Sequence, residues 1–319
     1  MTFEVELIQW LQSFRSDFWD FFFQFWTFFG EELVVIGILG FLYWCYDKKT
    51  GETIGLTVFI SLVLNSIIKV IFQRPRPYVN PANGIDGIRL DTAGGYSFPS
   101  GHTQGAAVVF GSLAVWLKKR WLTIVSVVII VMVAISRMYL GVHYLSDVLV
   151  GGLLGVGLAF IFHKLFENDA NRQKIYLISL VSSIALFLIS FVVYIFISQP
   201  DGDISGPQAL YNSMEGVAKM VGAIVGFVTG IRFEAKHVQF ENHRIIWKNI
   251  LRFVVGVGIV MGVRIGLKAI FALIVDSEAL VEGSMVPAAF AVIFDGIRYG
   301  IMVFVAIGVY PYLFRKVNC

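Results

Sequence analysis

Three ionisable side chains lie close together in the stretch SRMYLGVHYLSD, residues 136–147, which separates two long apolar runs. They are Arg137, His143 and Asp147. Asp147 follows His143 by four residues, a spacing that places both side chains on one face of a helix. A carboxylate there can accept the proton on one imidazole nitrogen and leave the other nitrogen ready to react. Because ionisable groups at membrane depth are costly, the stretch is a candidate functional site.

Two further clusters border apolar runs. In KVIFQRPRP, Lys69 lies about two helical turns before Arg76, so both cations can reach the same end of a helix. In FPSGH, Ser100 suits a helix N-cap, Gly101 lets a ligand approach the backbone, and His102 lies in the first turn. Taken singly, each cluster has an ordinary explanation: a lysine reaching the headgroups, a capped helix, or a structural His–Asp pair.

The three clusters together indicate one kind of chemistry. They supply the cations of Lys69, Arg76 and Arg137, the free amides of a helix N-terminus, two histidines and a carboxylate. Several cations and free amides suit a group with several anionic oxygens, namely phosphate. A histidine held beside such a group can act as a nucleophile toward phosphorus.

The composition identifies the environment of this site. Of the 319 residues, 57% are hydrophobic and only 15% are charged, and the mean hydropathy is +0.76. A soluble domain normally carries about a quarter charged residues, so the sequence predicts an integral membrane protein. The net charge of +3 is too small to indicate nucleic-acid binding. Cys45 and Cys319 cannot form a disulfide framework and match no metal-ligand spacing.

Apolar runs long enough to cross a membrane, about 20 residues each, can be counted along the chain. They lie near 31–47, 52–72, 101–117, 121–137, 144–166, 175–198, 214–232, 249–275 and 287–314. All must be helical, since a lipid-exposed backbone cannot leave its amides unpaired. The predicted fold class is an all-α integral membrane bundle of about nine transmembrane helices. We divide the chain into an N-terminal segment (1–30), a catalytic core (31–167) and additional helices of unassigned role (168–319).

The N-terminal segment is rich in aromatic side chains over residues 10–29. Its polar residues recur at helical steps and form one stripe; they are Ser13, Asp17, Asp20, Gln24 and Thr27. This pattern predicts an amphipathic helix that lies in the membrane interface with its rings at headgroup depth. The simplest role is anchoring, and the alternative is an entrance that gathers lipid.

Basic residues are concentrated in alternate loops and predict the orientation. One set of loops holds Lys48, Lys49, Lys118, Lys119, Arg120, Lys164, Arg172, Lys174, Arg232, Lys236, Arg244, Lys248, Arg315 and Lys316. The opposite set is mostly acidic or neutral. The positive-inside rule therefore places the N-terminus outside, the C-terminus in the cytoplasm and the three clusters on the extracytoplasmic face. The lack of an N-x-S/T sequon favours a bacterial plasma membrane.

The motifs K-x6-RP, PSGH and SR-x5-H-x3-D resemble the three signatures of the type 2 phosphatidic acid phosphatase superfamily, over roughly residues 50–165. That superfamily includes lipid phosphate phosphatases, glucose-6-phosphatase and vanadium haloperoxidases. The resemblance implies that His143 is the nucleophile, that Asp147 holds it, and that His102 is the general acid. It also implies a phosphate cradle of Lys69, Arg76, Ser100, Gly101 and Arg137. No metal or other cofactor is expected, because fixed cations stabilise the phosphate charge.

The predicted function is hydrolysis of a lipid phosphate or diphosphate through a phosphohistidine on the extracytoplasmic face. Undecaprenyl diphosphate, phosphatidylglycerophosphate, phosphatidic acid and sphingoid phosphates all fit a site at the membrane surface. The expected partners are this lipid substrate and the bilayer, with no nucleic acid. Two alternatives remain: a glucose-6-phosphatase-like hydrolase of a soluble sugar phosphate, and a non-enzymatic protein that binds or transports lipid phosphates.

Three other site chemistries are disfavoured. A zinc site of His102, His143 and Asp147 would place a divalent cation beside Lys69, Arg76 and Arg137, which repel it. An acyl hydrolase with a Ser100–His143–Asp147 triad would leave the three cations unexplained. Vanadium haloperoxidases are soluble proteins, whereas this chain is apolar throughout.

Charged residues also occur in the last two predicted spans, namely Arg264, Lys268, Asp295 and Arg298. A simple interpretation pairs Arg264 or Lys268 with Asp295 across the bundle, because buried charges must be paired. Three cations would then face one anion. We interpret this excess as a candidate headgroup site beside the phosphate cradle, which would favour a diphosphate or a substrate with a polar headgroup.

Overall fold

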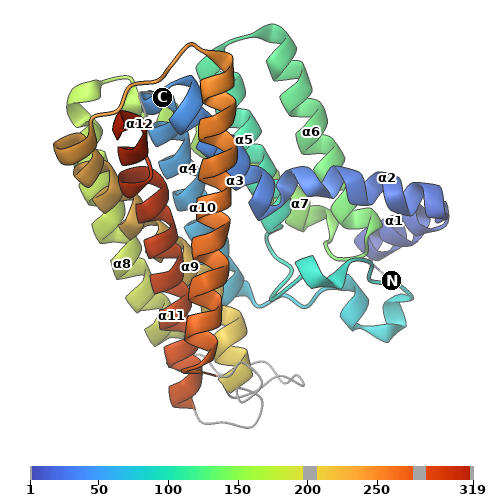
Figure 1. Cartoon of the computed structure of the whole chain (residues 1–319). Helices are drawn as coiled ribbons and strands as arrows, with labels where there is room; N and C mark the ends of the chain where they lie inside the picture. Colours follow the sequence, from blue (N-terminus) through green and yellow to red (C-terminus); the bar gives the residue numbers. More distant parts are fainter. Residues whose placement is uncertain (1, 197–206, 276–284, 317–319) are drawn as a thin grey trace. The chain divides into compact units, whose positions relative to one another are not determined.

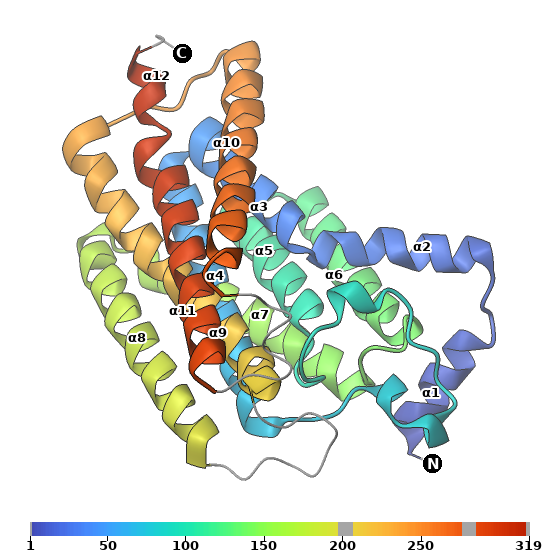
Figure 2. The ribbon, with the colours of Figure 1, turned by 60° about the horizontal axis from the view of Figure 1, so that its bottom comes forward.

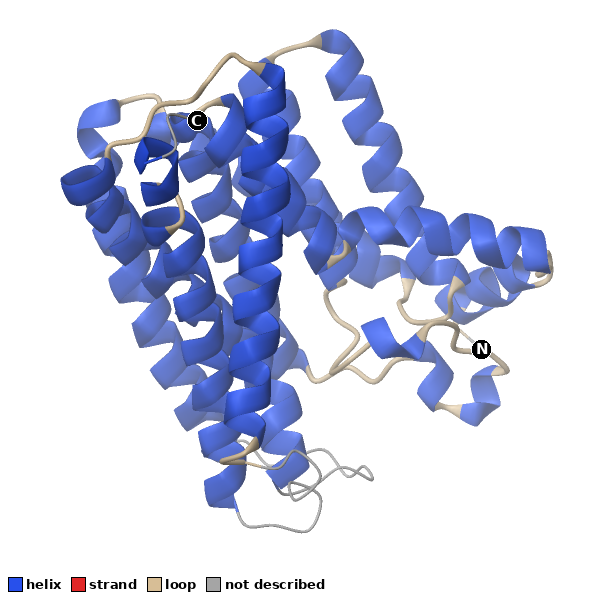
Figure 3. Ribbon diagram, in the orientation of Figure 1, coloured by secondary structure: helices blue, strands red, loops and turns tan. Residues whose placement is uncertain are grey.

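The computed structural model describes residues 2–196, 207–275 and 285–316, and these residues form helices and loops without any strand (Figures 1 and 3). The predicted all-α class is confirmed. The helices in chain order are α1 (Phe3–Gln12), α2 (Asp17–Thr27), α3 (Glu32–Phe41), α4 (Lys48–Phe72), α5 (Gly101–Leu117), α6 (Arg120–Tyr139), α7 (Leu145–Phe166), α8 (Arg172–Phe196), α9 (Pro207–Phe233), α10 (Ile246–Ala272), α11 (Met285–Phe304) and α12 (Tyr312–Lys316).

The helices form two compact units. The first comprises residues 1–36 and 64–167, and the second comprises residues 37–63 and 168–319. Within the described residues, seven helices are long and apolar enough to cross a membrane, or eight if the bent pair 17–30 and 32–46 is one span. The chain is therefore an integral membrane protein.

The expected number of nine spans is not confirmed. Helix α5 has 17 residues, which corresponds to about 26 Å at 1.5 Å per residue and falls short of a core of about 30 Å. The first expected span, 31–47, forms a helix that bends by 47° against the segment 17–30. Apolar composition alone predicts a complete span for each of these two segments.

The N-terminal aromatic segment is not one continuous helix. Helix α1 ends at Gln12, and α2 begins at Asp17 after Ser16, whose side chain caps it by accepting a hydrogen bond from the amide of Trp19. The expected polar stripe therefore starts at Asp17 rather than Ser13, because a capping serine interrupts the helix.

In the first unit, α5 packs closely against α7. A Cβ atom on Gly155 of α7 would lie 2.6 Å from the carbonyl oxygen of Gln104, so only glycine permits this approach. Gly151 meets the carbonyl oxygen of Ser100 in the same way, at 2.7 Å. These contacts bring the N-terminal ends of α5 and α7 together.

The loop 73–99 lies against α1 in the same unit (Figure 2). The side-chain amide of Gln9 donates to the carbonyl oxygen of Asn83, and that of Gln12 donates to Asp86. Val5 and Ile8 of α1 are buried in a cluster with Met138. Helix α1 is thus fixed to the loop and to the end of α6.

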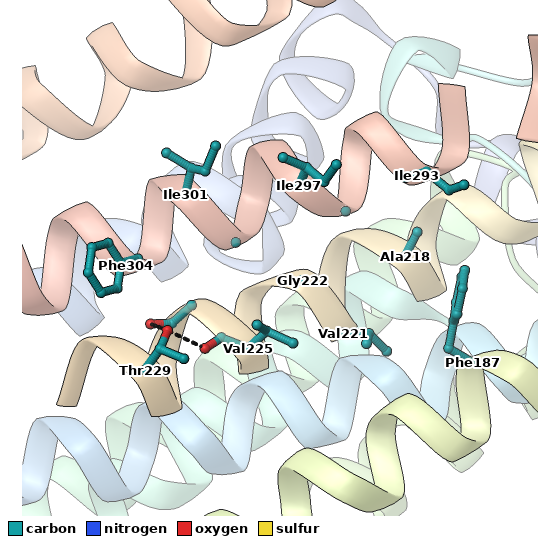
Figure 4. A pocket seen from close by; sticks show the side chains of 13 residues that line it. Phe187, Ala218, Val221, Gly222, Val225, Thr229, Ile293, Ile297, Ile301 and Phe304 are labelled. Atoms are coloured by element: carbon teal, nitrogen blue, oxygen red, sulfur yellow. Dashed lines mark hydrogen bonds between the residues drawn. The ribbon is translucent and has the colours of Figure 1, made fainter. Parts of the chain in front are cut away.

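In the second unit, α9 and α11 approach through glycines. A Cβ atom on Gly222 would lie 1.9 Å from the carbonyl oxygen of Gly296, and one on Gly226 would lie 2.0 Å from that of Gly300. Small residues at four-residue spacing are typical of packed membrane helices. Beside this contact lies an apolar groove of about 460 Å³, to which Phe187 of α8 also contributes (Figure 4).

Candidate active site

The three sequence clusters meet in the first unit, at one end of α4, α5, α6 and α7. Arg76 Nη1 lies 3.2 Å from Nε2 of His143. The amide of Ser100 donates to the carbonyl oxygen of Asp147 at 3.0 Å. The Lys69 ammonium, near the end of α4, donates to the carbonyl oxygen of Ser97, just before α5, at 3.5 Å. Residues as far apart in the sequence as Lys69 and Asp147 therefore share one site.

His143 and Asp147 form a buried pair. Nδ1 of His143 lies 3.3 Å from Oδ2 of Asp147, and the two side chains are 2% and 0% exposed. Oδ2 also accepts hydrogen bonds from the amide of Tyr144, at 2.9 Å, and from the hydroxyl of Ser97. The carboxylate is thus fixed in the first turn of α7. His143 lies before Tyr144, the N-cap residue of this helix, so the expected placement of both side chains on one helix face is wrong, although the two still meet.

Arg76 determines the tautomer of His143. A guanidinium can only donate hydrogen bonds, so the Nε2 atom that faces it must be unprotonated. The ring proton then lies on Nδ1, directed at Asp147. Burial, followed by the charges of Arg76, Lys69 and Arg137, lowers the pKa of His143 well below its ordinary value of 6.5. His143 therefore presents a neutral imidazole with a free lone pair on Nε2.

The Arg76 guanidinium is held firmly by backbone carbonyls. Nε donates to Gly95 at 2.9 Å, Nη2 to Gly94 at 2.7 Å, and Nη1 to Val142 at 2.9 Å. The Lys69 ammonium is similarly held by the carbonyl oxygen of Tyr96. Both cations are positioned by the glycine-rich loop that precedes α5.

Two groups at the site have buried polar atoms without partners. Nη1 of Arg137 donates to the hydroxyl of Thr27 at 2.9 Å, but its Nε and Nη2 are buried and unpaired among the described residues. Nε2 of His102 is also buried and unpaired there. Buried donors that lack partners in a protein interior call for an explanation. An anion with several oxygens bound between these side chains would satisfy them.

Ser100 and Gly101 form the start of α5. The Ser100 hydroxyl accepts a hydrogen bond from the amide of Thr103, at 3.4 Å, and lies 3.0 Å from its hydroxyl. Gly101 faces the side chain of Asn65, which donates to Gln104 at 2.8 Å. The Ser100 hydroxyl thus contacts Thr103, whereas His143 Nε2 faces Arg76, an arrangement unlike that of an acyl-hydrolase triad.

The side chains present do not suit a metal ion. Within the parts of the chain that the structure describes, no three His, Cys, Asp or Glu side chains gather as a metal site would require. The donors around His143 are mainly cations, which attract anions rather than metals.

Sequence reasoning missed two residues that contact Asp147. Nη1 of Arg74 lies 2.9 Å from Oδ1 of Asp147, and Ser97 donates to Oδ2. Arg74 lies inside the first motif, at one of the six unspecified positions between Lys69 and Arg76, and the repeated arginine in RPRP was the available signal. Nothing in the local sequence distinguishes Ser97 from other loop serines.

The charged residues of the last two spans lie in the second unit. Asp295 of α11 pairs with Arg298 at 2.6 Å, lies 3.7 Å from the ammonium of Lys219, and accepts a hydrogen bond from Tyr211 at 2.9 Å. Its partners on α9, Lys219 and Tyr211, were not considered from the sequence. Arg264 and Lys268 lie on α10. Headgroup binding by Arg264, Lys268, Asp295 and Arg298 stays a prediction.

Sequence comparisons relate this geometry to known proteins. The model of the PAP2 superfamily matches residues 52–171, and that of the transmembrane extension of PAP2 superfamily phosphatases matches residues 218–319. The second match falls in the region whose role the sequence left open.

Several curated relatives share the first of these regions. Phosphatidylglycerophosphatase B of Bacillus subtilis is 36% identical over 152 residues, which cover 44% of this chain and 70% of that protein. Undecaprenyl-diphosphatase of Sulfolobus acidocaldarius is 31% identical over 153 residues, covering 46% and 70%. Lipid A 4′-phosphatase of Bacteroides thetaiotaomicron is 32% identical over 183 residues, covering 51% and 78%. The chain thus belongs to the PAP2 superfamily of membrane phosphatases, the family that its motifs resemble.

Proposed function

We propose that the protein hydrolyses the phosphate of a membrane lipid by forming a phosphohistidine on His143. The observation that carries this proposal is the position of the His143 ring, whose Nε2 faces Arg76 while Nδ1 faces Asp147. The names of the three relatives support a lipid substrate, since each is a phosphatase or diphosphatase of a lipid.

In the first step, Nε2 of His143 attacks phosphorus, and the bond from phosphorus to the leaving oxygen breaks. The guanidinium of Arg76 stays on its backbone carbonyls, and the Nη1–H that faces the imidazole donates to a phosphoryl oxygen instead, in a stronger, charge-assisted hydrogen bond. As positive charge develops on the imidazole, the Asp147 carboxylate stabilises it through Nδ1–H.

His102 acts first as the general acid for the leaving group and then as the general base for water. A bound phosphate offsets the cations around the site, so the imidazole of His102 can take up a proton and donate it from Nε2 to the departing oxygen. Neutral His102 then accepts a proton from the water that attacks the phosphohistidine. Inorganic phosphate leaves, and His143 returns to its neutral form.

The cradle stabilises charge in both steps. Among the residues that the structure describes, two buried nitrogens of Arg137 have no partner, and Lys69 and Arg76 complete the cationic side of the site. Fixed cations cost no reorganisation when charge develops on the equatorial phosphoryl oxygens.

The positive-inside pattern supports a site on the extracytoplasmic face of a bacterial plasma membrane. A lipid with its phosphate at the surface and its chain in the bilayer can reach the site from the membrane. Among such lipids, we propose phosphatidylglycerophosphate, undecaprenyl diphosphate and phosphatidic acid as the first to test.

The test is phosphate release by the purified protein in lipid nanodiscs. The panel contains the three lipids and glucose 6-phosphate, with His143→Ala as the matched control. We expect release from at least one lipid, an acid-labile phosphoenzyme in the wild type, and neither in the variant. Release from glucose 6-phosphate alone would overturn the lipid assignment, and equal release by His143→Ala would overturn the covalent mechanism.

A further inference from the structure

One guanidinium lies between two carboxylates beside the active site. Nη1 of Arg74 is 2.9 Å from Oδ1 of Asp147, and Nη2 is 2.8 Å from Oε2 of Glu4. The guanidinium also stacks over the ring of Tyr144, with its central carbon 3.8 Å from the ring centroid. Planar stacking and two-sided pairing fix the orientation of the arginine.

Glu4 and Arg74 together hold the first turn of α7. The second oxygen of Glu4 accepts a hydrogen bond from the amide of Ser146 at 2.6 Å. Arg74 Nη1 donates to the hydroxyl of the same serine at 2.6 Å. Ser146 immediately precedes Asp147. Glu4 and Arg74, which we call the clamp, therefore hold the backbone that carries the Asp147 carboxylate. An acidic side chain at a helix N-terminus is also favoured by the helix dipole.

The clamp has a direct consequence for His143. Asp147 is fully buried, and a buried carboxylate without a cationic partner is strongly unfavourable. Arg74 pairs with Oδ1, which leaves Oδ2 to face Nδ1 of His143. The arginine therefore selects which carboxylate oxygen meets the imidazole.

Glu4 is itself held in the ionised form. Burial opposes its charge, but the amide of Ser146 and the guanidinium of Arg74 outweigh burial and hold the pKa of Glu4 below its ordinary value. Helix α1, which carries Glu4, is anchored by the buried side chains of Val5 and Ile8. Helix α1 thus holds Glu4 in position against Arg74 and Ser146.

We propose that Arg74 and Glu4 are positioning residues that hold Asp147, and through it His143, in the geometry for attack on phosphorus. This inference rests on the proposed phosphohistidine mechanism. It assigns to α1 a role in chemistry in addition to its contact with the loop 73–99. Neither residue touches the phosphate; each acts through Asp147.

Rate measurements on Arg74→Ala test this role. We expect kcat and the rate constant of phosphoenzyme formation to fall on the order of 10- to 100-fold, as is typical for groups that orient a reactive imidazole. KM should change little, since the phosphate cradle is intact. Arg74→Lys should recover part of the loss, because a cation is restored, and added guanidinium should partly restore Arg74→Ala. Glu4→Gln should show a smaller loss of kcat.

Matched controls separate positioning from general effects of charge. Arg15→Ala removes an arginine of the same unit that pairs with Asp20 and Asp86, and Glu6→Gln removes an exposed carboxylate from α1. Both should retain wild-type kcat and KM. Where Arg74→Ala does not fold, as judged by gel filtration, the comparison uses Arg74→Lys and Glu4→Gln.

The outcomes distinguish this inference from the function on which it rests. If the wild type forms a phosphohistidine while Arg74→Ala keeps wild-type kcat, or loses activity through KM alone, the positioning role is overturned and the proposed function stands. If the wild type forms no phosphoenzyme on any lipid phosphate, the proposed mechanism itself fails.

Discussion

Nη1 of Arg76 lies 3.2 Å from Nε2 of His143, so a cradle arginine contacts the proposed nucleophilic atom directly. The contact keeps Nε2 unprotonated, since both atoms cannot donate. We therefore expect the phosphoryl group to enter between the guanidinium and the imidazole. The same arginine that protects the lone pair in the resting site would then bind the group that this lone pair attacks.

His143→Ala should abolish phosphoenzyme formation, because it removes the proposed nucleophile, and His102 is assigned to the leaving group instead. His102→Ala should instead slow the reaction by about 10²- to 10⁴-fold, the usual contribution of a general acid. The measurement is rapid-quench labelling of the phosphoenzyme with a lipid phosphate and with p-nitrophenyl phosphate.

The leaving group provides the control for this pair. A p-nitrophenolate leaves without a proton, so His102→Ala should form the phosphoenzyme from that substrate at close to the wild-type rate, while His143→Ala should not. Equal defects of His102→Ala on both substrates would argue against its role as the acid.

The pH dependence follows from the lowered pKa of His143. Burial and the charges of Arg76, Lys69 and Arg137 disfavour the protonated ring and lower this pKa. A pKa below the ordinary value keeps the nucleophile neutral at lower pH, so the acidic limb of kcat/KM should lie below pH 6.5.

This limb must be separated from ionisation of the substrate, whose phosphate can also titrate near pH 6. The profile is therefore measured with two substrates whose phosphate pKa values differ. A limb that stays in place belongs to the enzyme. A limb fixed at or above pH 6.5 would contradict the neutral resting state of His143.

The sequence identified the charged residues that meet at the candidate site better than the residues that support them. His102, His143 and Arg137 border apolar runs, where charge is costly, so each is noticeable in the sequence. Arg74 and Ser97 contact Asp147 only because the loop folds back over α7, and loop geometry has no periodic signal. Glu4 could not be predicted for the same reason, because its partner Arg74 is 70 residues away in the sequence.

The helix count shows a similar limit. Hydropathy identifies apolar segments but does not fix where a helix bends or how long it runs, and both depend on caps and packing. Ser16 begins a new helix where the aromatic pattern alone would continue the first one. Helix α5 is short because it is bounded by the Ser100 cap and by Lys118, whose backbone is left-handed.

Activity should survive chelators and be inhibited by vanadate. In the proposed mechanism, the fixed cations of Lys69, Arg76 and Arg137 supply the charge stabilisation that a metal supplies in other phosphatases. Vanadate adopts the trigonal bipyramidal geometry of the transferring phosphoryl group and should therefore bind more tightly than phosphate. Phosphate release is measured with and without EDTA, and vanadate inhibition is compared in wild type and Arg137→Ala.

Two results would contradict this expectation. Loss of activity in EDTA with recovery on adding Mg²⁺ or Zn²⁺ would show that a metal is required. Unchanged vanadate affinity in Arg137→Ala would show that the two unpaired nitrogens of Arg137 do not face the phosphoryl group.

The charged residues of the second unit provide the last prediction. If Arg264 and Arg298 bind a second phosphate, Arg264→Ala and Arg298→Ala should raise KM for a lipid diphosphate more than for a lipid monophosphate. Lys219→Ala is the matched control, because Lys219 approaches the same aspartate, Asp295, from α9 and is expected only to support the bundle. Its effect should be equal on both substrates. Since Asp295 also pairs with Arg298 at 2.6 Å, stability is measured for each variant alongside KM. If Arg264→Ala and Arg298→Ala change KM equally for the two substrates, as Lys219→Ala does, these charges only stabilise the helix bundle. Buried ion pairs can stabilise a bundle without contacting its substrate.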